Sequence, residues 1–212
     1  VKDRTGQAVV DFLNEQVNRR DNVLHQRGIR VTQIWVEGGK CAGVQVLDGP
    51  ALRWIKAKAV VLATGGGGHL FANTTNPTQA AGEGIALAWR AGAVIEDLEF
   101  FQFHPTALKL DGAPSFLISE ALRGEGAVLV DSLGQSPVNH LEGKDLASRD
   151  QVSRALFKAM QKQKVDYMCL DVKSIAVEDV GARFPSIFQR CKELGLDPLK
   201  ELIPVAPSAH YW

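Results

Sequence analysis

Glu99–Gly126 is the stretch that most restricts how this chain can fold, because prolines and glycines interrupt it along its whole length. Pro105 and Pro114 disfavour a continuous helix, and three glycines favour turns. We therefore expect loops here, without a long helix or a regular strand. Among its polar residues are His104, Ser119, Glu120, Arg123 and Glu125, which have little apolar reason to occur together in one segment. Loops that are held in a fixed conformation often carry catalytic and ligand-binding residues, so we expect functional residues in this stretch.

The composition excludes several classes of protein. Of the 212 residues, 45% are hydrophobic and 23% are charged, which is enough for one large domain or two small ones. Lysine plus arginine equals aspartate plus glutamate at 24 each, which argues against a nucleic-acid partner. Three separated cysteines without a CxxC pair favour a reducing, cytoplasmic compartment and no metal site. No apolar run reaches the roughly 18–20 residues of a membrane span, so we expect no direct membrane insertion.

The first part of the chain has the pattern of an α/β domain. Apolar residues at helical spacing predict a helix over 9–17, with Asp3 or Thr5 as its cap. Four short runs favour strands: Asn22–Leu24, Gly28–Val36, Cys41–Leu47 and Ala51–Ile55. Gly38-Gly39 and Asp48-Gly49-Pro50 are typical hairpin turns, which indicates an antiparallel β-meander. Ala59–Ala63 is apolar at every position, as in a strand buried on both faces.

Two glycine-rich segments follow that apolar run. Gly65–Gly68 comes directly after it, where α/β folds bind nucleotides, although a flexible turn fits the glycines about equally well. Gly82 and Gly84 flank Glu83 at the start of a helix predicted over Ile85–Arg90. Unpaired N–H groups at a helix start can bind an anion or a ribityl chain. Glu83 could bind hydroxyls, or simply match the helix dipole.

The later part alternates helices and strands. An amphipathic helix is predicted over Asp145–Lys162, capped by Ser148 or Asp145, with Arg149 in its first turn. A cation there opposes the helix dipole, so Arg149 has no local structural reason to be present. We also predict a strand at Tyr167–Asp171 and helix over Asp179–Leu194, which Pro185 divides. A proline-rich extended segment then leads to an isolated histidine, His210, on a loop.

Each candidate residue also has an ordinary structural explanation. A lone histidine such as His104 is more often a hydrogen-bonded structural residue than a catalyst. Ser119 and Glu120 could begin a helix, with Arg123 pairing with Glu120 or Glu125 on its surface. The functional interpretation gains weight only because these residues occur together with the glycine-rich loop.

Seven motifs occur in order along the chain: ATGGGG at 63–68, TTNP at 74–77, GEGIALAWRAGA at 82–93, LEFFQFHPTAL at 98–108, SEALRGEG at 119–126, SRDQVSRAL at 148–156 and AHY at 209–211. Together they resemble the flavoprotein family of succinate dehydrogenases, fumarate reductases and L-aspartate oxidases. QFHPT followed by EALRGEG is highly specific for that family. The wording EALRGEG, and the compact stretch between Gly126 and His210, favour its L-aspartate oxidase branch.

The resemblance implies a fold of the α/β (α+β) class in two parts. Residues 1–97 would form part of a Rossmann-like FAD-binding domain with a β-meander, 98–205 a fumarate-reductase-type capping domain, and 206–212 the return to the FAD-binding domain. Because the chain begins without Met, we expect it to be an internal fragment. The family's GxGxxG fingerprint would precede Val1, and a substrate-binding arginine would follow Trp212. We expect the isolated chain to be inactive and to hold FAD weakly.

The resemblance also implies roles for individual residues. FAD would contact eight residues: Ala63, Thr64, Gly65, Gly66, Asn76, Gly82, Glu83 and Gly84. The dicarboxylate substrate, L-aspartate, would contact His104, Ser119, Glu120, Arg123 and His210. Arg149 matches the family's proton donor or acceptor, but a guanidinium scarcely deprotonates at neutral pH, so an electrostatic role is the alternative. Ser119 stands where the family usually has Thr, and Glu83 where it usually has Asp.

The implied reaction is oxidation of L-aspartate to iminoaspartate by hydride transfer to flavin N5, on the quinolinate route to NAD. Oxygen or fumarate would accept the electrons, and coupling to a quinolinate synthase is conceivable. Two other interpretations stay open: a flavoprotein subunit of a succinate dehydrogenase or fumarate reductase, and a non-catalytic α/β interaction module.

Overall fold

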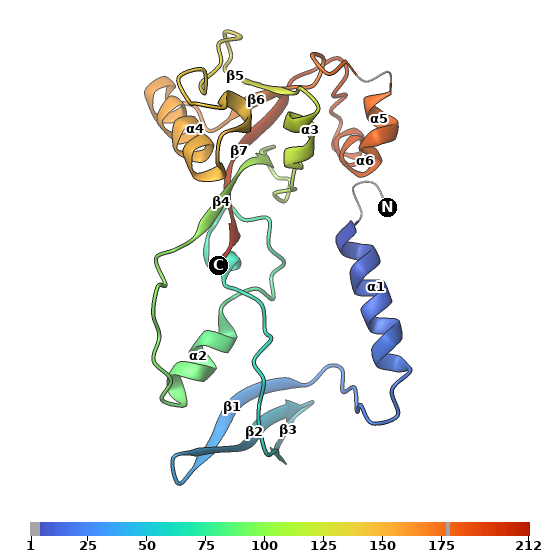
Figure 1. The fold of residues 1–212 in the computed structure, drawn as a ribbon, viewed down its shortest axis with the longest axis vertical. Helices are drawn as coiled ribbons and strands as arrows, with labels where there is room; N and C mark the ends of the chain where they lie inside the picture. Colours follow the sequence, from blue (N-terminus) through green and yellow to red (C-terminus); the bar gives the residue numbers. More distant parts are fainter. Residues whose placement is uncertain (1–4, 177–178) are drawn as a thin grey trace.

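The computed structural model describes residues 5–176 and 179–212. The chain extends from a small sheet at one end to a larger sheet with helices at the other (Figure 1). The first part contains α1 (Thr5–Asn18), β1 (Arg30–Glu37), β2 (Lys40–Asp48), β3 (Ala51–Lys56), the short 3-10 helix η1 (Gly68–Leu70) and α2 (Glu83–Arg90). The second part contains β4 (Gln102–Leu108), α3 (Glu120–Gly124), β5 (Val128–Val130), η2 (Lys144–Leu146), α4 (Arg149–Gln163), β6 (Met168–Asp171), α5 (Val180–Arg183), α6 (Pro185–Glu193) and β7 (Ile203–Tyr211).

The small sheet is the predicted antiparallel meander. Its strands lie in the order β1-β2-β3. Gly38 and Gly39 join β1 to β2 with φ of 58° and 75°, a conformation that the hairpin turn requires and that glycine adopts without strain. The helix predicted over 9–17 is also confirmed, as α1, and no residue of α1 is buried in this chain.

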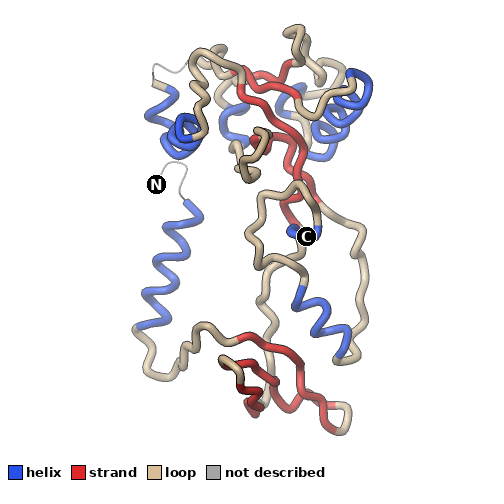
Figure 2. Tube along the Cα trace, turned by 180° about the vertical axis from the view of Figure 1, so that it is seen from behind, coloured by secondary structure: helices blue, strands red, loops and turns tan. Residues whose placement is uncertain are grey.

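The large sheet places the last strand inside. Its order is β4-β7-β6-β5, and each neighbouring pair is antiparallel. Figure 2 shows this sheet running from the helical end of the molecule down to the C-terminus. The main hydrophobic core lies between this sheet and helices α3 to α6, with fully buried residues such as Leu129, Leu156, Leu170 and Ile203.

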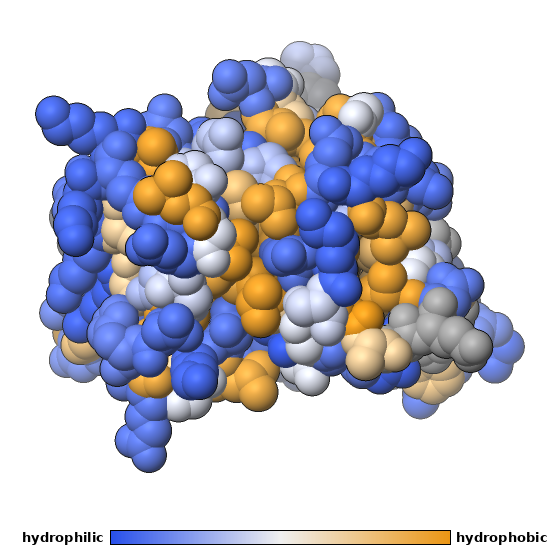
Figure 3. All heavy atoms as spheres, turned by 90° about the horizontal axis from the view of Figure 1, so that it is seen from above, coloured by the Kyte–Doolittle hydropathy of each residue, from blue (hydrophilic) through white to orange (hydrophobic). Residues whose placement is uncertain are grey.

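The later helices follow the sequence prediction closely. Ser148 is the N-cap of α4, and Val152, Ala155 and Leu156 form its buried face. Pro185 divides the predicted helix into α5 and α6, as expected. Seen from above, this end of the molecule shows hydrophobic residues in patches between hydrophilic side chains (Figure 3). In residues 5–176 and 179–212 no helix is long and apolar enough to cross a membrane.

Three predicted elements are wrong. Asn22–Leu24 is turn and coil instead of strand, and Ala59–Ala63 is an exposed, extended segment instead of a buried strand. Val61 is 87% exposed. A strand buried on both faces needs partner strands, and the described residues provide none beside this segment.

The third error concerns Glu99–Gly126, which does contain a strand. β4 runs through Pro105, and its pairing with β7 shifts register between His104 and Ala107. Such an irregularity accommodates a proline within a ladder, because the unpaired position needs no N–H donor. His210 likewise lies on a strand, β7, and not on a loop.

Candidate active site

Arg149 and Glu120 form the centre of the candidate site. Arg149 Nε lies 2.9 Å from Glu120 Oε2, and Arg149 Nη1 donates to Gln102 Oε1 at 2.9 Å. The three residues come from α4, α3 and β4, so tertiary packing brings the contacts together. The Arg149 side chain is 29% exposed, which leaves part of the guanidinium accessible. Arg149 is thus a cation held in place by two other elements.

Arg123 is a second cation, buried directly beside the first pair. Its side chain is inaccessible to solvent, and Nη2 lies 3.8 Å from Glu120 Oε1. Nη1 donates to the carbonyl of Asp145, whereas Nε and Nη2 have no hydrogen-bond partner. Burial lowers the pKa of Arg123, while Glu120 and Asp145 oppose that shift. The alternative expected from sequence, an Arg123 pair with Glu120 on the surface of a helix, is therefore only partly right, because the arginine is buried.

His104 and His210 lie close together on the paired strands β4 and β7, although the residue opposite His104 in the register is Ser208. Their ring centroids are 5.3 Å apart and the rings are tilted by 66°. Burial lowers the pKa of His104 to about 3, with smaller contributions from Arg149, His210 and Arg123. Burial also lowers the pKa of His210, followed by the charge of Arg149. Both rings are therefore neutral at neutral pH, and each carries one N–H.

The tautomer of His104 follows from its backbone contact. The Thr106 N–H donates to His104 Nδ1 at 3.2 Å. Because a backbone amide can only donate, Nδ1 is the acceptor and the ring proton lies on Nε2. His104 can therefore donate one hydrogen bond to a ligand from Nε2.

The glycine-rich loop packs against the start of α2. Gly82 N donates to Gly66 O at 3.2 Å, and Gly82 has a left-handed φ of 71°. A Cβ on Gly84 would lie 1.9 Å from Thr64 Oγ1, so only glycine permits this approach. At the start of α2 the N–H groups of Ile85 and Ala86 already donate to Gly82 O, so the first N–H groups, those of Glu83 and Gly84, are the ones that a helix start leaves without an intrahelical acceptor. Backbone N–H groups that no side chain covers could therefore bind a phosphate or a polyhydroxyl group at this position.

Asn76 connects this loop to the histidines. Its Nδ2 donates to the carbonyl of His210 at 2.7 Å, and its side chain fills the space where Gly68 would carry a Cβ. Asn76 thus joins the two groups of residues that the sequence assigned to cofactor and to substrate.

Other predicted site residues have structural roles in this chain. Ser119 is the N-cap of α3 and accepts from Ala121 N at 3.2 Å, as its structural alternative proposed. Glu83 lies in the first turn of α2 and pairs with Arg30 at the surface. Ala63 and Gly65 are exposed in the extended segment and loop. Their assigned roles toward ligands stay predictions.

Sequence reasoning missed two side chains of the site. Gln102 orients Arg149, and the Thr75 hydroxyl lies 2.7 Å from His210 Nδ1. Both occur within quoted motifs, QFHPT and TTNP, whose polar members were not assigned individually. Their positions could have indicated a role, because each is a polar residue next to or near a proposed ligand-binding residue on the same strand or turn: Gln102 near His104, and Thr75 beside Asn76.

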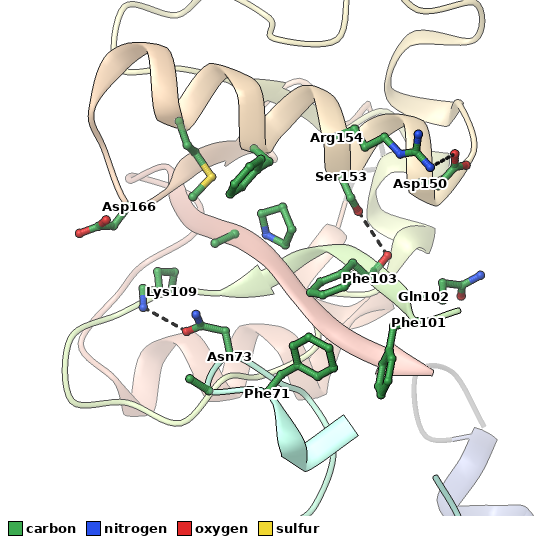
Figure 4. A pocket seen from close by; sticks show the side chains of 15 residues that line it. Phe71, Asn73, Phe101, Gln102, Phe103, Lys109, Asp150, Ser153, Arg154 and Asp166 are labelled. Carbon is green, nitrogen blue, oxygen red and sulfur yellow. Dashed lines mark hydrogen bonds and ion pairs between the residues drawn. The ribbon is translucent and has the colours of Figure 1, made fainter. Parts of the chain in front are cut away.

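A cavity of about 760 Å³ lies beneath α4 (Figure 4). Phe71, Phe101 and Phe103 form part of its wall. The ring centroid of Phe71 lies 4.5 Å from that of Phe101 and 5.4 Å from that of Phe103. Gln102 also lines it, but neither histidine nor Arg149 does. The cavity therefore adjoins the candidate site through Gln102, although Arg123 and Arg149 do not line it.

Comparisons with known proteins show the family to which the chain belongs. The model of the FAD binding domain family matches residues 1–212. The chain is 48% identical to the L-aspartate oxidase of Nostoc sp. over 99% of its length, and 48% identical to that of Synechocystis sp. over the same share. Among solved structures, a quinol-fumarate reductase with menaquinol molecules superimposes with a TM-score of 0.90 at 30% identity, covering the whole chain and 40% of that structure's chain.

The chain spans 38% and 39% of the lengths of the two oxidases. The family's cofactor is FAD, and the glycine-rich loop, the start of α2 and Asn76 provide residues that fit it. The chain therefore belongs to the FAD binding domain family, among the flavoproteins of the succinate dehydrogenase, fumarate reductase and L-aspartate oxidase type that its motifs resemble.

Proposed function

We propose that the chain is part of an FAD-dependent oxidoreductase that converts L-aspartate to iminoaspartate. The observation that supports this most is the pair of arginines at the carboxylate of Glu120, with two neutral histidines that feel the charge of Arg149. A dicarboxylate needs several fixed donors, and guanidinium groups suit carboxylates best. The identity to L-aspartate oxidases supports the choice of substrate.

FAD, when bound, supplies an acceptor for the hydride that leaves C2 of the substrate. The Gly65–Gly68 loop and the first turn of α2 would hold it through backbone N–H groups. Gly66 and Gly84 fit this role because each lies too close to neighbouring atoms to carry a Cβ. We further propose that 1–97 and 206–212 belong to the FAD-binding part and 98–205 to the capping part.

The substrate carboxylates would be held by donors from both strands. The His104 Nε2 proton is available for one carboxylate, and His210 would donate to the other. Glu120 is anionic, so it would orient Arg149 or meet the substrate ammonium, and it does not bind a carboxylate. A succinate molecule lacks the ammonium and would leave Glu120 without that partner.

Arg149 would act as a fixed cation close to the reacting carbon. Glu120 and Gln102 hold two of its nitrogens and so set the direction of the guanidinium. In the oxidation the C2–H bond breaks as a hydride, a proton leaves the amine, and a C=N bond forms. A positive charge beside the substrate holds its carboxylate in the orientation for that transfer. Relay of a proton through Arg149 is the alternative role.

A second function is supported by the fold. The quinol-fumarate reductase superimposes over the whole chain, so a flavoprotein subunit acting on succinate or fumarate is the alternative. For the oxidase, oxygen or fumarate would accept the electrons, and the product would feed the quinolinate route to NAD, with possible coupling to a quinolinate synthase.

The test is substrate turnover by the full-length protein that contains this chain. The FAD-loaded enzyme should oxidise L-aspartate with oxygen or fumarate as acceptor, and should oxidise succinate far more slowly. Turnover of succinate alone would select the second function. A full-length protein that FAD cannot reconstitute would instead support the non-catalytic interaction module.

A further inference from the structure

A set of hydrogen bonds joins the turn at 73–76 to the end of β7. Ala209 N donates to Asn73 O at 3.0 Å, and Thr75 N donates to Ala209 O at 3.1 Å. The Thr74 hydroxyl donates to the same Ala209 carbonyl at 3.0 Å. The backbone around His210 is therefore held by a turn that lies far earlier in the chain, with 135 positions between Thr75 and His210.

The Thr75 side chain adds a contact to the ring itself. Its Oγ1 lies 2.7 Å from His210 Nδ1. Either atom could in principle donate, because a hydroxyl and a neutral imidazole each have one proton to offer. The direction of this hydrogen bond decides which ring nitrogen of His210 carries the proton.

Satisfaction of the hydroxyl proton favours donation by Thr75. Among the residues in 5–176 and 179–212, His210 Nδ1 is the one acceptor within hydrogen-bonding distance of Thr75 Oγ1. If Nδ1 donated instead, the hydroxyl proton of this half-buried residue would lack a protein acceptor, which is unfavourable. Donation by Thr75 places the ring proton on Nε2, as the Thr106 N–H does for His104.

We propose that Thr75 is a positioning residue that donates its hydroxyl proton to His210 Nδ1 and thereby keeps the Nε2 proton of His210 facing a substrate carboxylate. The identity of that ligand rests on the function proposed above, whereas the tautomer does not. With both histidines in this form, the site presents two neutral N–H donors from neighbouring strands. In the other tautomer, His210 would present a lone pair to the carboxylate and repel it.

The tautomer of His210 is important for ligand binding because the half-buried ring is neutral and carries a single proton. The pKa of His210 lies below its ordinary value, because of burial and the charge of Arg149, so the ring is neutral at neutral pH. A protonated ring would carry N–H groups on both nitrogens and would need no help from Thr75. The groups that face the ring are Arg149, His104 and Tyr211.

The direct test is nitrogen NMR of full-length, FAD-loaded protein labelled with ¹⁵N-histidine. The His210 signals are assigned by their loss in His210→Gln. Wild type at mildly alkaline pH should show a protonated Nε2 and an unprotonated Nδ1. Thr75→Val keeps the shape of the side chain but removes the hydroxyl, so its His210 signals should move toward a mixture of tautomers, and Thr75→Ser should restore them.

A neighbouring threonine provides the matched control. Thr74→Val removes a hydroxyl that contacts Ala209 O and Asn76 N but not the ring, so it should leave the proton of His210 on Nε2. In kinetics with L-aspartate, Thr75→Val should raise KM about tenfold with little change in kcat, the loss expected for one hydrogen bond to a charged group. Thr75→Ser should return KM to within about twofold of wild type.

The outcomes separate this inference from the proposed function. A wild-type spectrum with the proton on Nδ1, or identical His210 signals in wild type and Thr75→Val, would overturn the role of Thr75. The wild-type spectrum decides the question even if Thr75→Val does not fold. Absence of L-aspartate turnover in a wild type with the expected tautomer would refute the proposed substrate and leave the tautomer assignment standing.

Discussion

Replacing Arg149 by leucine separates activity from stability. Arg149 is the first residue of α4, where a cation opposes the helix dipole. Its removal would relieve about 0.3–1 kcal/mol of that repulsion. The ion pair with Glu120 is partly exposed, at 29% and 40% for the two side chains, and is worth about 0.2–1 kcal/mol. The two effects nearly cancel, so the free energy of unfolding should change by less than about 1 kcal/mol.

The effect on catalysis should be much larger. If Arg149 contacts the substrate carboxylate, truncation leaves a charged group without its partner, which costs about 2–4 kcal/mol. That range corresponds to a fall of about 30- to 1,000-fold in kcat/KM. FAD content should be unchanged, because Arg149 contacts Glu120 and Gln102 and not the glycine-rich loop.

The assay compares Arg149→Leu with a matched control in the full-length protein. Arg154 lies on the same helix, its side chain is 77% exposed, and its pair with Asp150 is a long 3.8 Å. Arg154→Leu should therefore keep kcat/KM within about threefold of wild type. The reasoning is refuted if Arg149→Leu also stays within that range, or if both variants lose activity equally.

Three further predictions follow from burial and close contacts. Below pH 6.5 His104 is protonated in the unfolded chain but stays neutral in the folded chain, where its pKa is about 3. Acidification should therefore lower the free energy of unfolding of wild type by up to about 1.4 kcal/mol per pH unit more than that of His104→Gln. Urea unfolding at several pH values measures this difference. Gly84→Ala should weaken FAD binding measured by flavin fluorescence, because its Cβ would overlap Thr64 Oγ1, whereas Gly124→Ala, with nothing within 4 Å, should not. Leu170→Ala should cost about 2–5 kcal/mol in the free energy of unfolding, since Leu170 is fully buried; a loss below about 1 kcal/mol would show that the core can collapse around the gap.

Sequence motifs predict which residues belong to the candidate site, but not the contacts between them. Arg149 stood out because its position in the first turn contradicts the helix dipole, and the structure supplies its partner from a different helix, 29 positions away. Nothing in the local pattern predicts that partner, because it comes from a different helix, α3. The burial of Arg123 was missed for the same reason: on its own short helix it looks like a surface cation.

The errors in secondary structure have a common physical cause. The apolar pattern of Ala59–Ala63 predicts a strand only where neighbouring strands can pair with it, and this chain offers none among its described residues. Conversely, β4 and β7 form despite their prolines because each has a long partner. Pro204 lacks an N–H, yet its carbonyl still accepts from Lys109 N at 2.9 Å. Pairing partners, which are distant in sequence, decided both cases.

The position of β7 has a consequence for how the protein is made. Of the four strands in this sheet it is synthesised last, yet it lies between β4 and β6. Until it arrives, both neighbours expose unpaired edges, and such edges favour association with other chains. Thr75 and His210 are 135 positions apart, so the loop that their contact closes is long and slow to form. The sheet can therefore close only after β7 has been made, whereas the helices need only local contacts to begin to form.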